Sequence, residues 1–201
     1  LATWVAGRPL VLFAGRFSYE KNIPALVDAL VLVARERPDV AIVMFGEGPE
    51  RDAAAQRIAA AGMVDRIALP GYSPRLQAWM AGAAACVSVS HFEGHPNVVI
   101  EAAFVGCPLV LSDIPAHREL FDERAATFVP LPSARPRNHP AHDDRMRRVL
   151  GSIAEGLDIR DLIELAATRE SGDFAGIRAG PDVLYANMRV DPALLEPAPA
   201  V

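Results

Sequence analysis

The feature that most constrains the fold is an alternation, repeated over the first 130 residues, of short apolar runs with stretches of helical periodicity. Apolar runs that lack polar alternation are typical of strands buried on both faces of a parallel sheet. The stretches between them show helical spacing of apolar residues, as in Ile23, Leu26, Val27 and Leu30. The predicted strands are residues 9–14, 40–45, 67–69, 85–89, 109–112 and 126–129, and the predicted helices include residues 22–37, 50–61 and 96–105, with another opened by residues 71–74.

This order of elements predicts an α/β domain. Crossovers between parallel strands are right-handed, so a doubly wound, Rossmann-like sheet with helices on both faces is the simplest arrangement. After residue 130 the chain becomes a loop rich in Pro, Arg and His, followed by further helical stretches. We therefore expect one domain over residues 1–185, with its core at 9–130, C-terminal helices in an extension at 143–188, and a flexible tail at 189–201.

The charge of the chain argues against a nucleic-acid-binding protein. The 25 acidic and 20 basic side chains give a formal net charge of −5, whereas binding to a phosphate backbone requires a basic surface. We find no signal peptide and no uninterrupted apolar stretch of the roughly 20 residues that span a bilayer. Cys86 and Cys107 are expected to be reduced thiols. These features predict a cytoplasmic protein, and the first residue, which is not Met, is interpreted as a sign that the chain is a fragment.

Polar and charged residues follow each predicted strand where it ends. Arg16 and Lys21 follow the first strand, and Gly46 begins the turn after the second. Ligands of open parallel sheets bind outside the carboxyl ends of the strands, so these loops are expected to form a single site. Tight turn geometry alone also explains glycines such as Gly46, and a role in lining a nucleotide pocket remains open beside it.

The segment after the fourth strand is the most informative. Gly94 allows close approach of the backbone to a ligand, and Pro96 suits the first turn of a helix. The N–H groups of Asn97 and Val98 would then be free to hold a phosphate. Glu93 and Glu101 could accept hydrogen bonds from neutral sugar hydroxyls, while Arg16 and Lys21 neutralise the phosphates from the opposite wall.

The sequence resembles the C-terminal, donor-binding domain of retaining glycosyltransferases with the GT-B fold, in the large family of capsule and lipopolysaccharide sugar transferases. The two glutamates separated by seven residues, Glu93 and Glu101, match the family motif. Further matching stretches lie at residues 15–16, 20–22, 45–50 and 106–110. The resemblance implies a nucleotide sugar, a UDP- or GDP-hexose, as substrate, with no other cofactor and no metal.

The resemblance also implies a role for each residue of the predicted site. Glu93 would contact the donor sugar and Glu101 the ribose, while Arg16 and Lys21 hold the diphosphate. Arg16, Lys21 and Glu93 would stabilise the transition state. The predicted donor-binding residues are Gly15, Arg16, Lys21, Gly46, Glu93, Gly94, Asn97, Val98 and Glu101.

The resemblance also implies an N-terminal acceptor-binding domain, which we expect to be missing from this chain. Any peripheral contact with the inner face of the membrane would be made through that missing domain. The fragment alone is therefore expected to bind donor weakly and to be nearly inactive.

Two other functions remain open at this point. A nucleotide-sugar 2-epimerase would share the sheet and the diphosphate site. A regulatory nucleotide-binding domain of flavodoxin-like type would require an acidic cluster after the first strand, where Glu20 is the only acid. A zinc site at His139 and His142 and a nucleophile at Ser112 are both disfavoured, because neither has the partner residues that such chemistry requires.

Overall fold

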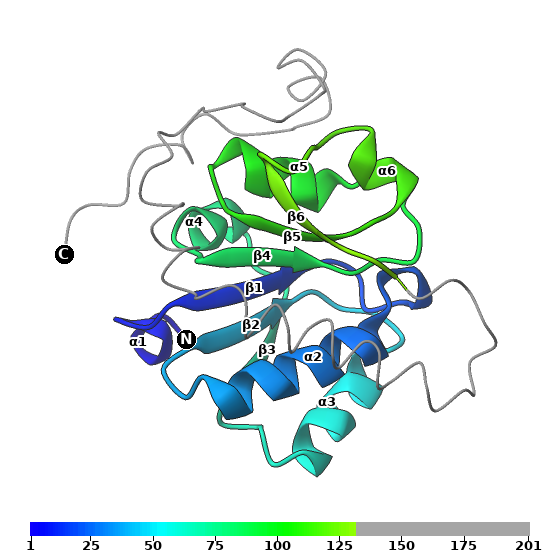
Figure 1. The fold of residues 1–201 in the computed structure, drawn as a ribbon. Helices are drawn as coiled ribbons and strands as arrows, with labels where there is room; N and C mark the ends of the chain where they lie inside the picture. Colours follow the sequence, from blue (N-terminus) through cyan, green and yellow to red (C-terminus); the bar gives the residue numbers. More distant parts are fainter. Residues whose placement is uncertain (132–201) are drawn as a thin grey trace.

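The structure, a computed structural model, describes residues 1–131. Within them, parallel strands form one sheet in the order β3-β2-β1-β4-β5-β6 (Figure 1). The strands are β1 (Leu10–Ala14), β2 (Ala41–Phe45), β3 (Ile67–Gly71), β4 (Ala85–Ser88), β5 (Leu109–Ser112) and β6 (Ala126–Val129). The helices are α1 (Ala2–Val5), α2 (Ile23–Glu36), α3 (Arg51–Ala60), α4 (Leu76–Ala81), α5 (Asn97–Phe104), α6 (Pro115–Arg118) and the 3-10 helix η1 (Tyr19–Lys21). The predicted α/β fold with a doubly wound parallel sheet is confirmed.

The strand order reverses between β1 and β4. From β1 the chain first builds outward to β2 and β3, and it then returns to the other side of β1 to add β4, β5 and β6. At such a switch point the loops that leave the two central strands diverge, which opens a crevice at the carboxyl edge of the sheet. The topology therefore places the loops after β1 and β4 on either side of this crevice.

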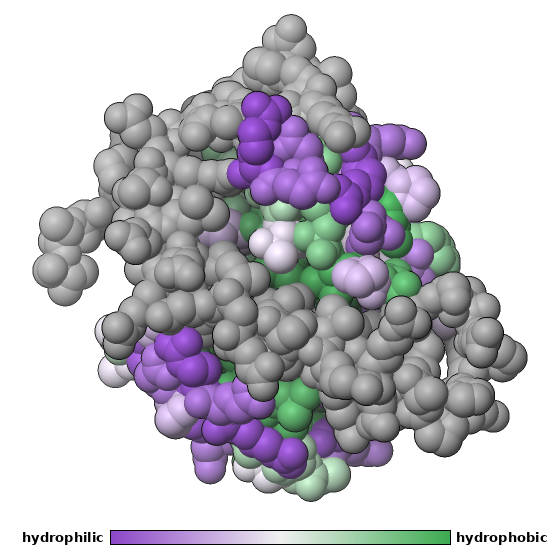
Figure 2. All heavy atoms as spheres, viewed as in Figure 1, coloured by the Kyte–Doolittle hydropathy of each residue, from purple (hydrophilic) through white to green (hydrophobic). Residues whose placement is uncertain are grey.

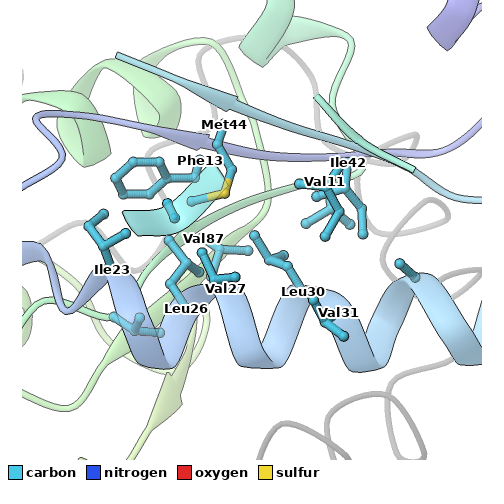
Figure 3. Packing of buried hydrophobic residues seen from close by; sticks show 14 of the residues in the cluster. Val11, Phe13, Ile23, Leu26, Val27, Leu30, Val31, Ile42, Met44 and Val87 are labelled. Atoms are coloured by element: carbon cyan, nitrogen blue, oxygen red, sulfur yellow. The ribbon is translucent and has the colours of Figure 1, made fainter. Parts of the chain in front are cut away.

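Two apolar layers hold the helices on the sheet. Helices α2 and α3 cover one face, while α4 and α5 cover the other (Figure 1). Leu26, Val27 and Leu30 of α2 point toward Phe13 and Met44 of the sheet (Figure 3). Burial of each such side chain contributes about 1.5–3 kcal/mol, so the packing fixes α2 and the loop that precedes it.

The surface follows from this layering. In the view of Figure 1, hydrophilic side chains gather over the outer helices, and hydrophobic side chains are visible between them at the level of the sheet (Figure 2). Among the described residues, every helix is too short or too polar to cross a membrane. The predicted helices at 143–188 and the predicted tail at 189–201 lie outside the described residues.

Candidate functional site

Backbone hydrogen bonds join the loops that follow β1, β2 and β3. The Gly15 N–H donates to the Phe45 carbonyl at 3.1 Å, and the Gly46 N–H donates to the Gly71 carbonyl at 2.9 Å. Gly46 has a φ of +125°, and a Cβ there would lie 1.9 Å from the Gly15 carbonyl oxygen. Only glycine permits this conformation and this contact. Turn geometry is therefore sufficient to explain Gly46, and the three loops form one connected rim.

A cleft of about 280 Å³ opens beside this rim, near the lower end of the range of roughly 300–1,000 Å³ that is usual for small-molecule sites. Its lining includes Arg16, whose exposed side chain forms no hydrogen bond or ion pair with another described residue. This leaves the guanidinium available to an anion. The lining residues are Ala14, Gly15, Arg16, Phe45, Gly46, Glu47, Tyr72, Ser73, Leu76 and Val98.

The N-terminus of α5 closes one side of the cleft. The helix begins at Asn97, with Pro96 as its N-cap. The Asn97 N–H donates to the His95 carbonyl at 2.9 Å, whereas the Val98 N–H has no acceptor among the described residues. Of the two amides that the sequence suggested for a phosphate, only that of Val98 is thus available. Val98 also lines the cleft.

Lys21 and Glu93 form an ion pair next to the cleft. The Lys21 Nζ lies 2.6 Å from Glu93 Oε1 and 2.9 Å from Oε2, and the two side chains are 17% and 6% exposed. The hydroxyl of Ser90 donates to Glu93 Oε1 at 2.6 Å. The sequence suggested that Lys21 faces the carboxylates across a diphosphate, but the structure pairs it directly with Glu93. The loops are close enough for this because the His91 N–H donates to the Glu20 carbonyl at 2.8 Å.

Glu101 has a different environment from Glu93. It lies on α5 and accepts a hydrogen bond from Gln77 Nε2 of α4 at 3.2 Å. Burial raises the pKa of Glu101 above its usual value, and the Gln77 bond opposes this effect. The two glutamates of the motif thus lie in separate hydrogen-bonding networks. Neither they nor Lys21, Gly94 or Asn97 line the cleft itself.

A polar cluster that the sequence analysis missed lies next to Glu93. It is formed by four buried residues, Ser88, Ser90, Ser112 and His117. The Ser112 hydroxyl donates to the Ser90 carbonyl at 2.7 Å, and His117 Nδ1 lies 2.9 Å from the Ser112 carbonyl oxygen. A sequence signal for this cluster does exist. Ser88, Ser90 and Ser112 interrupt or end apolar runs at the carboxyl edge of the sheet, where a hydroxyl requires a partner.

Other polar residues that follow these strands have structural contacts. The ring centroids of His91 and Tyr19 are 5.2 Å apart. Asp113 forms an ion pair with Arg118 at 2.6 Å, and Ser112 is fully buried, which does not suit a nucleophile. Among the described residues, no group of three or more side chains is placed to hold a metal ion. His139 and His142 lie outside them.

The chain is similar in sequence to known proteins. The family described as glycosyl transferases group 1 matches residues 8–139. The Vi polysaccharide biosynthesis protein VipC/TviE of Salmonella typhi is 31% identical over 114 residues, which are 57% of this chain and 20% of that protein.

Two solved structures share the fold. Anabaena Alr3699/HepE, in complex with UDP and glucose, has a TM-score of 0.64 at 21% identity, over 85% of this chain and 44% of that one. The C-terminal domain of a glycosyl transferase group 1 family protein (LpcC) from Francisella tularensis has a TM-score of 0.62 at 20% identity, over 83% of this chain and 88% of that domain.

The chain spans between 20% and 34% of the length of the first three curated relatives that it matches. The family match covers more than half of the chain and includes all the described strands. The parallel sheet is also that of the GT-B glycosyltransferases among the similar structures. The chain therefore belongs to the glycosyl transferases group 1 family.

Proposed function

We propose that this chain holds the nucleotide-sugar donor of a retaining hexosyltransferase, which moves a hexose from UDP or GDP to a glycan or lipid acceptor. The main support is the cleft at the carboxyl ends of β1, β2 and β3, where Arg16 and the unpaired Val98 N–H face the same space. A guanidinium and a helix N-terminus are both well suited to bind phosphate. Membership in a glycosyltransferase family gives this anion site its substrate class.

The proposed donor lies along the cleft. Its diphosphate contacts Arg16 and Val98, and the nucleoside extends toward Tyr72 and Ser73, which also line the cleft. The connected glycine rim lets the backbone approach the phosphates without intervening side chains. Glu101, one turn into α5, accepts hydrogen bonds from the ribose hydroxyls with its carboxylate.

The sugar end of the donor is assigned to the Lys21–Glu93 pair. An ammonium group has three N–H donors, and Lys21 uses two of them on Glu93. The third donor is available for a phosphate oxygen, so Lys21 can hold the donor without leaving Glu93. Glu93 in turn accepts a hydrogen bond from a sugar hydroxyl while the lysine neutralises its charge.

These residues stabilise the departure of the nucleoside diphosphate. Cleavage of the bond between the anomeric carbon and the phosphate oxygen builds negative charge on the leaving group. Arg16, Lys21 and the Val98 N–H are positioned to stabilise that charge as it develops, without reorganisation of solvent. In a retaining transfer the leaving phosphate can accept the proton of the acceptor hydroxyl, and this fits a site where Arg16 and Lys21 serve as cations.

We propose that the acceptor is bound by a further domain of the parent enzyme. Two similar solved chains, the pneumococcal O-GlcNAc transferase GtfA and HepE, are covered to only 35% and 44% by this chain. The isolated chain is accordingly expected to bind donor with little or no transfer. Turnover by the chain alone at ordinary enzymatic rates of about 1–10³ s⁻¹ would contradict this part of the proposal.

Calorimetric titration with UDP, GDP and their hexose derivatives tests the donor site. We expect binding that prefers one base and weakens by about 10–100-fold in Arg16→Ala, the usual effect of losing a charge-assisted hydrogen bond. Glu101→Ala should also weaken binding. Arg35→Ala, which removes another exposed charge from the last turn of α2, is the control and should bind within about twofold of the unaltered chain. No binding of any nucleotide at millimolar concentration would overturn the proposal.

A further inference from the structure

The polar cluster next to Glu93 extends the proposed site beyond the residues that touch the donor. It links the loop after β4 to the loop after β5. Ser90 donates from its hydroxyl to Glu93, and its carbonyl accepts from the Ser112 hydroxyl. Ser112 in turn contacts His117 on α6. A continuous chain of hydrogen bonds therefore connects a buried imidazole to the carboxylate assigned to the donor sugar.

The direction of each hydrogen bond follows from the chemistry of the groups. Glu93 is a carboxylate paired with Lys21 and only accepts, so the single hydroxyl proton of Ser90 goes to it. The Ser88 hydroxyl, 3.2 Å from Ser90 Oγ, must then donate to that oxygen. Ser112 Oγ donates to the Ser90 carbonyl, so it acts only as an acceptor toward His117.

These directions also fix the tautomer of His117. Its Nδ1 lies 2.9 Å from the Ser112 carbonyl oxygen and 3.3 Å from the Ser112 hydroxyl. Both are acceptors here, so Nδ1 carries the proton. Burial lowers the pKa of His117, which keeps the ring neutral, and Nε2 is then a bare acceptor. Among the described residues nothing donates to Nε2, although the side chain is 0% exposed.

An unpaired buried acceptor is unfavourable, and an apolar side chain of similar size would avoid it. The histidine therefore supplies a hydrogen-bond donor at Nδ1, which such a side chain lacks. Its N–H is the donor that fixes Ser112, and Ser112 is the donor that fixes the Ser90 carbonyl. We propose that His117 is a positioning residue for the donor sugar, acting through Ser112 and Ser90 to hold the Glu93 carboxylate in place. This inference rests on the proposed function.

The test compares the nucleotide with its sugar derivative. For each variant, the ratio of the Kd for UDP to that for UDP-glucose measures what the sugar adds to binding, and GDP with GDP-mannose replaces this pair if the chain prefers guanine. His117→Leu should reduce this ratio at least threefold while the Kd for the nucleotide alone stays within twofold. His117→Asn, whose amide nitrogen can take the place of Nδ1–H, should restore the ratio to within twofold of the unaltered chain.

Two further variants separate positioning from general loss of stability. Ser90→Ala removes the hydrogen bond to Glu93 and should reduce the ratio as His117→Leu does. Ile58→Ala truncates a buried side chain of α3 in the other apolar layer and should lower stability without changing the ratio. An unchanged ratio in His117→Leu, or an equal reduction in Ile58→Ala, would overturn the proposal.

A second readout does not require a ligand. The ¹³Cδ resonance of Glu93 should shift in His117→Leu and return in His117→Asn, and the ¹⁵N pattern of His117 should be that of the neutral Nδ1–H tautomer. If the unaltered chain bound no nucleotide, the proposed function would fail while this readout would still decide whether His117 positions Glu93. An unmoved Glu93 resonance in His117→Leu would contradict the inference.

Discussion

Replacing Lys21 with methionine removes the cation of a nearly buried ion pair and leaves the Glu93 carboxylate with the Ser90 hydroxyl as its hydrogen-bond donor. At an effective dielectric constant of about 20, unit charges separated by the 2.6 Å of the shortest contact attract by roughly 6 kcal/mol. The cost of removing both charges from water offsets much of this attraction. Loss of one partner of a fully buried pair typically costs about 3–5 kcal/mol. Because the Lys21 side chain is still 17% exposed, we expect a loss of about 2–4 kcal/mol.

Urea denaturation followed by circular dichroism measures this loss. The set consists of the unaltered chain, Lys21→Met, Glu93→Gln and the double variant, from which a coupling energy is obtained. We expect a coupling energy of about 1–3 kcal/mol, because the double variant no longer buries an unpaired charge. Asp39→Asn is the control. It removes the charge of a 53%-exposed side chain from the Arg37–Asp39 pair and should cost less than about 1 kcal/mol.

An unchanged stability of Lys21→Met would contradict this prediction. If Lys21→Met stays within about 0.5 kcal/mol of the unaltered chain, as surface substitutions usually do, and the coupling energy is close to zero, then solvent screens the pair. The reasoning that the loops after β1 and β4 hold a desolvated pair beside the cleft would then be refuted.

Three further predictions concern the glycines, Glu101 and His117. Gly46→Ala places a Cβ 1.9 Å from a backbone oxygen, whereas at Gly94 no atom lies within 4 Å of the added Cβ. Gly46→Ala should therefore lower the free energy of unfolding by about 3 kcal/mol or more, and Gly94→Ala should lower it by less than about 0.5 kcal/mol. Gly94→Ala should still weaken donor binding, as measured by calorimetry. Equal losses of stability would contradict this. Burial raises the pKa of Glu101, so its charged form is disfavoured in the folded chain. Glu101→Gln should therefore raise the melting temperature at pH 7 while weakening nucleotide binding. The gain in melting temperature should shrink as the pH falls and the native carboxyl takes up a proton. Burial lowers the pKa of His117 below 6.5, so the unfolded chain binds the proton first and stability falls as the pH drops below that value. His117→Asn should flatten this part of the stability–pH curve. Superimposable curves for the two chains would refute the lowered pKa of His117.

The fold was predictable because its local signals agree with one another. The central strands β1 and β2 are continuous apolar runs, buried on both faces by two helical layers, and α2 shows the helical spacing that its packing requires. The short elements α1, η1 and α6 were not predicted. They contain three or four residues each, which is too few for a periodic pattern to emerge.

The candidate site was predictable where it depends on position along the sheet. Gly15, Arg16 and Gly46 lie at the cleft because strand ends place them there. The Lys21–Glu93 pair joins residues 72 positions apart, and its geometry depends on how two loops pack. The role of His117 likewise depends on hydrogen bonds between the loops after β4 and β5. Side-chain partners of this kind cannot be read from spacing within one segment.

The central claim is that the cleft between the glycine rim and the start of α5 holds the nucleoside diphosphate of the donor. Titration of the ¹⁵N-labelled chain with UDP or GDP, followed by amide chemical shifts, tests it most directly. The account predicts that the largest shifts occur at Gly15, Arg16, Gly46 and Val98, with saturation for one of the two bases. Saturable shifts that leave these four amides unchanged and occur on another face of the sheet would contradict it.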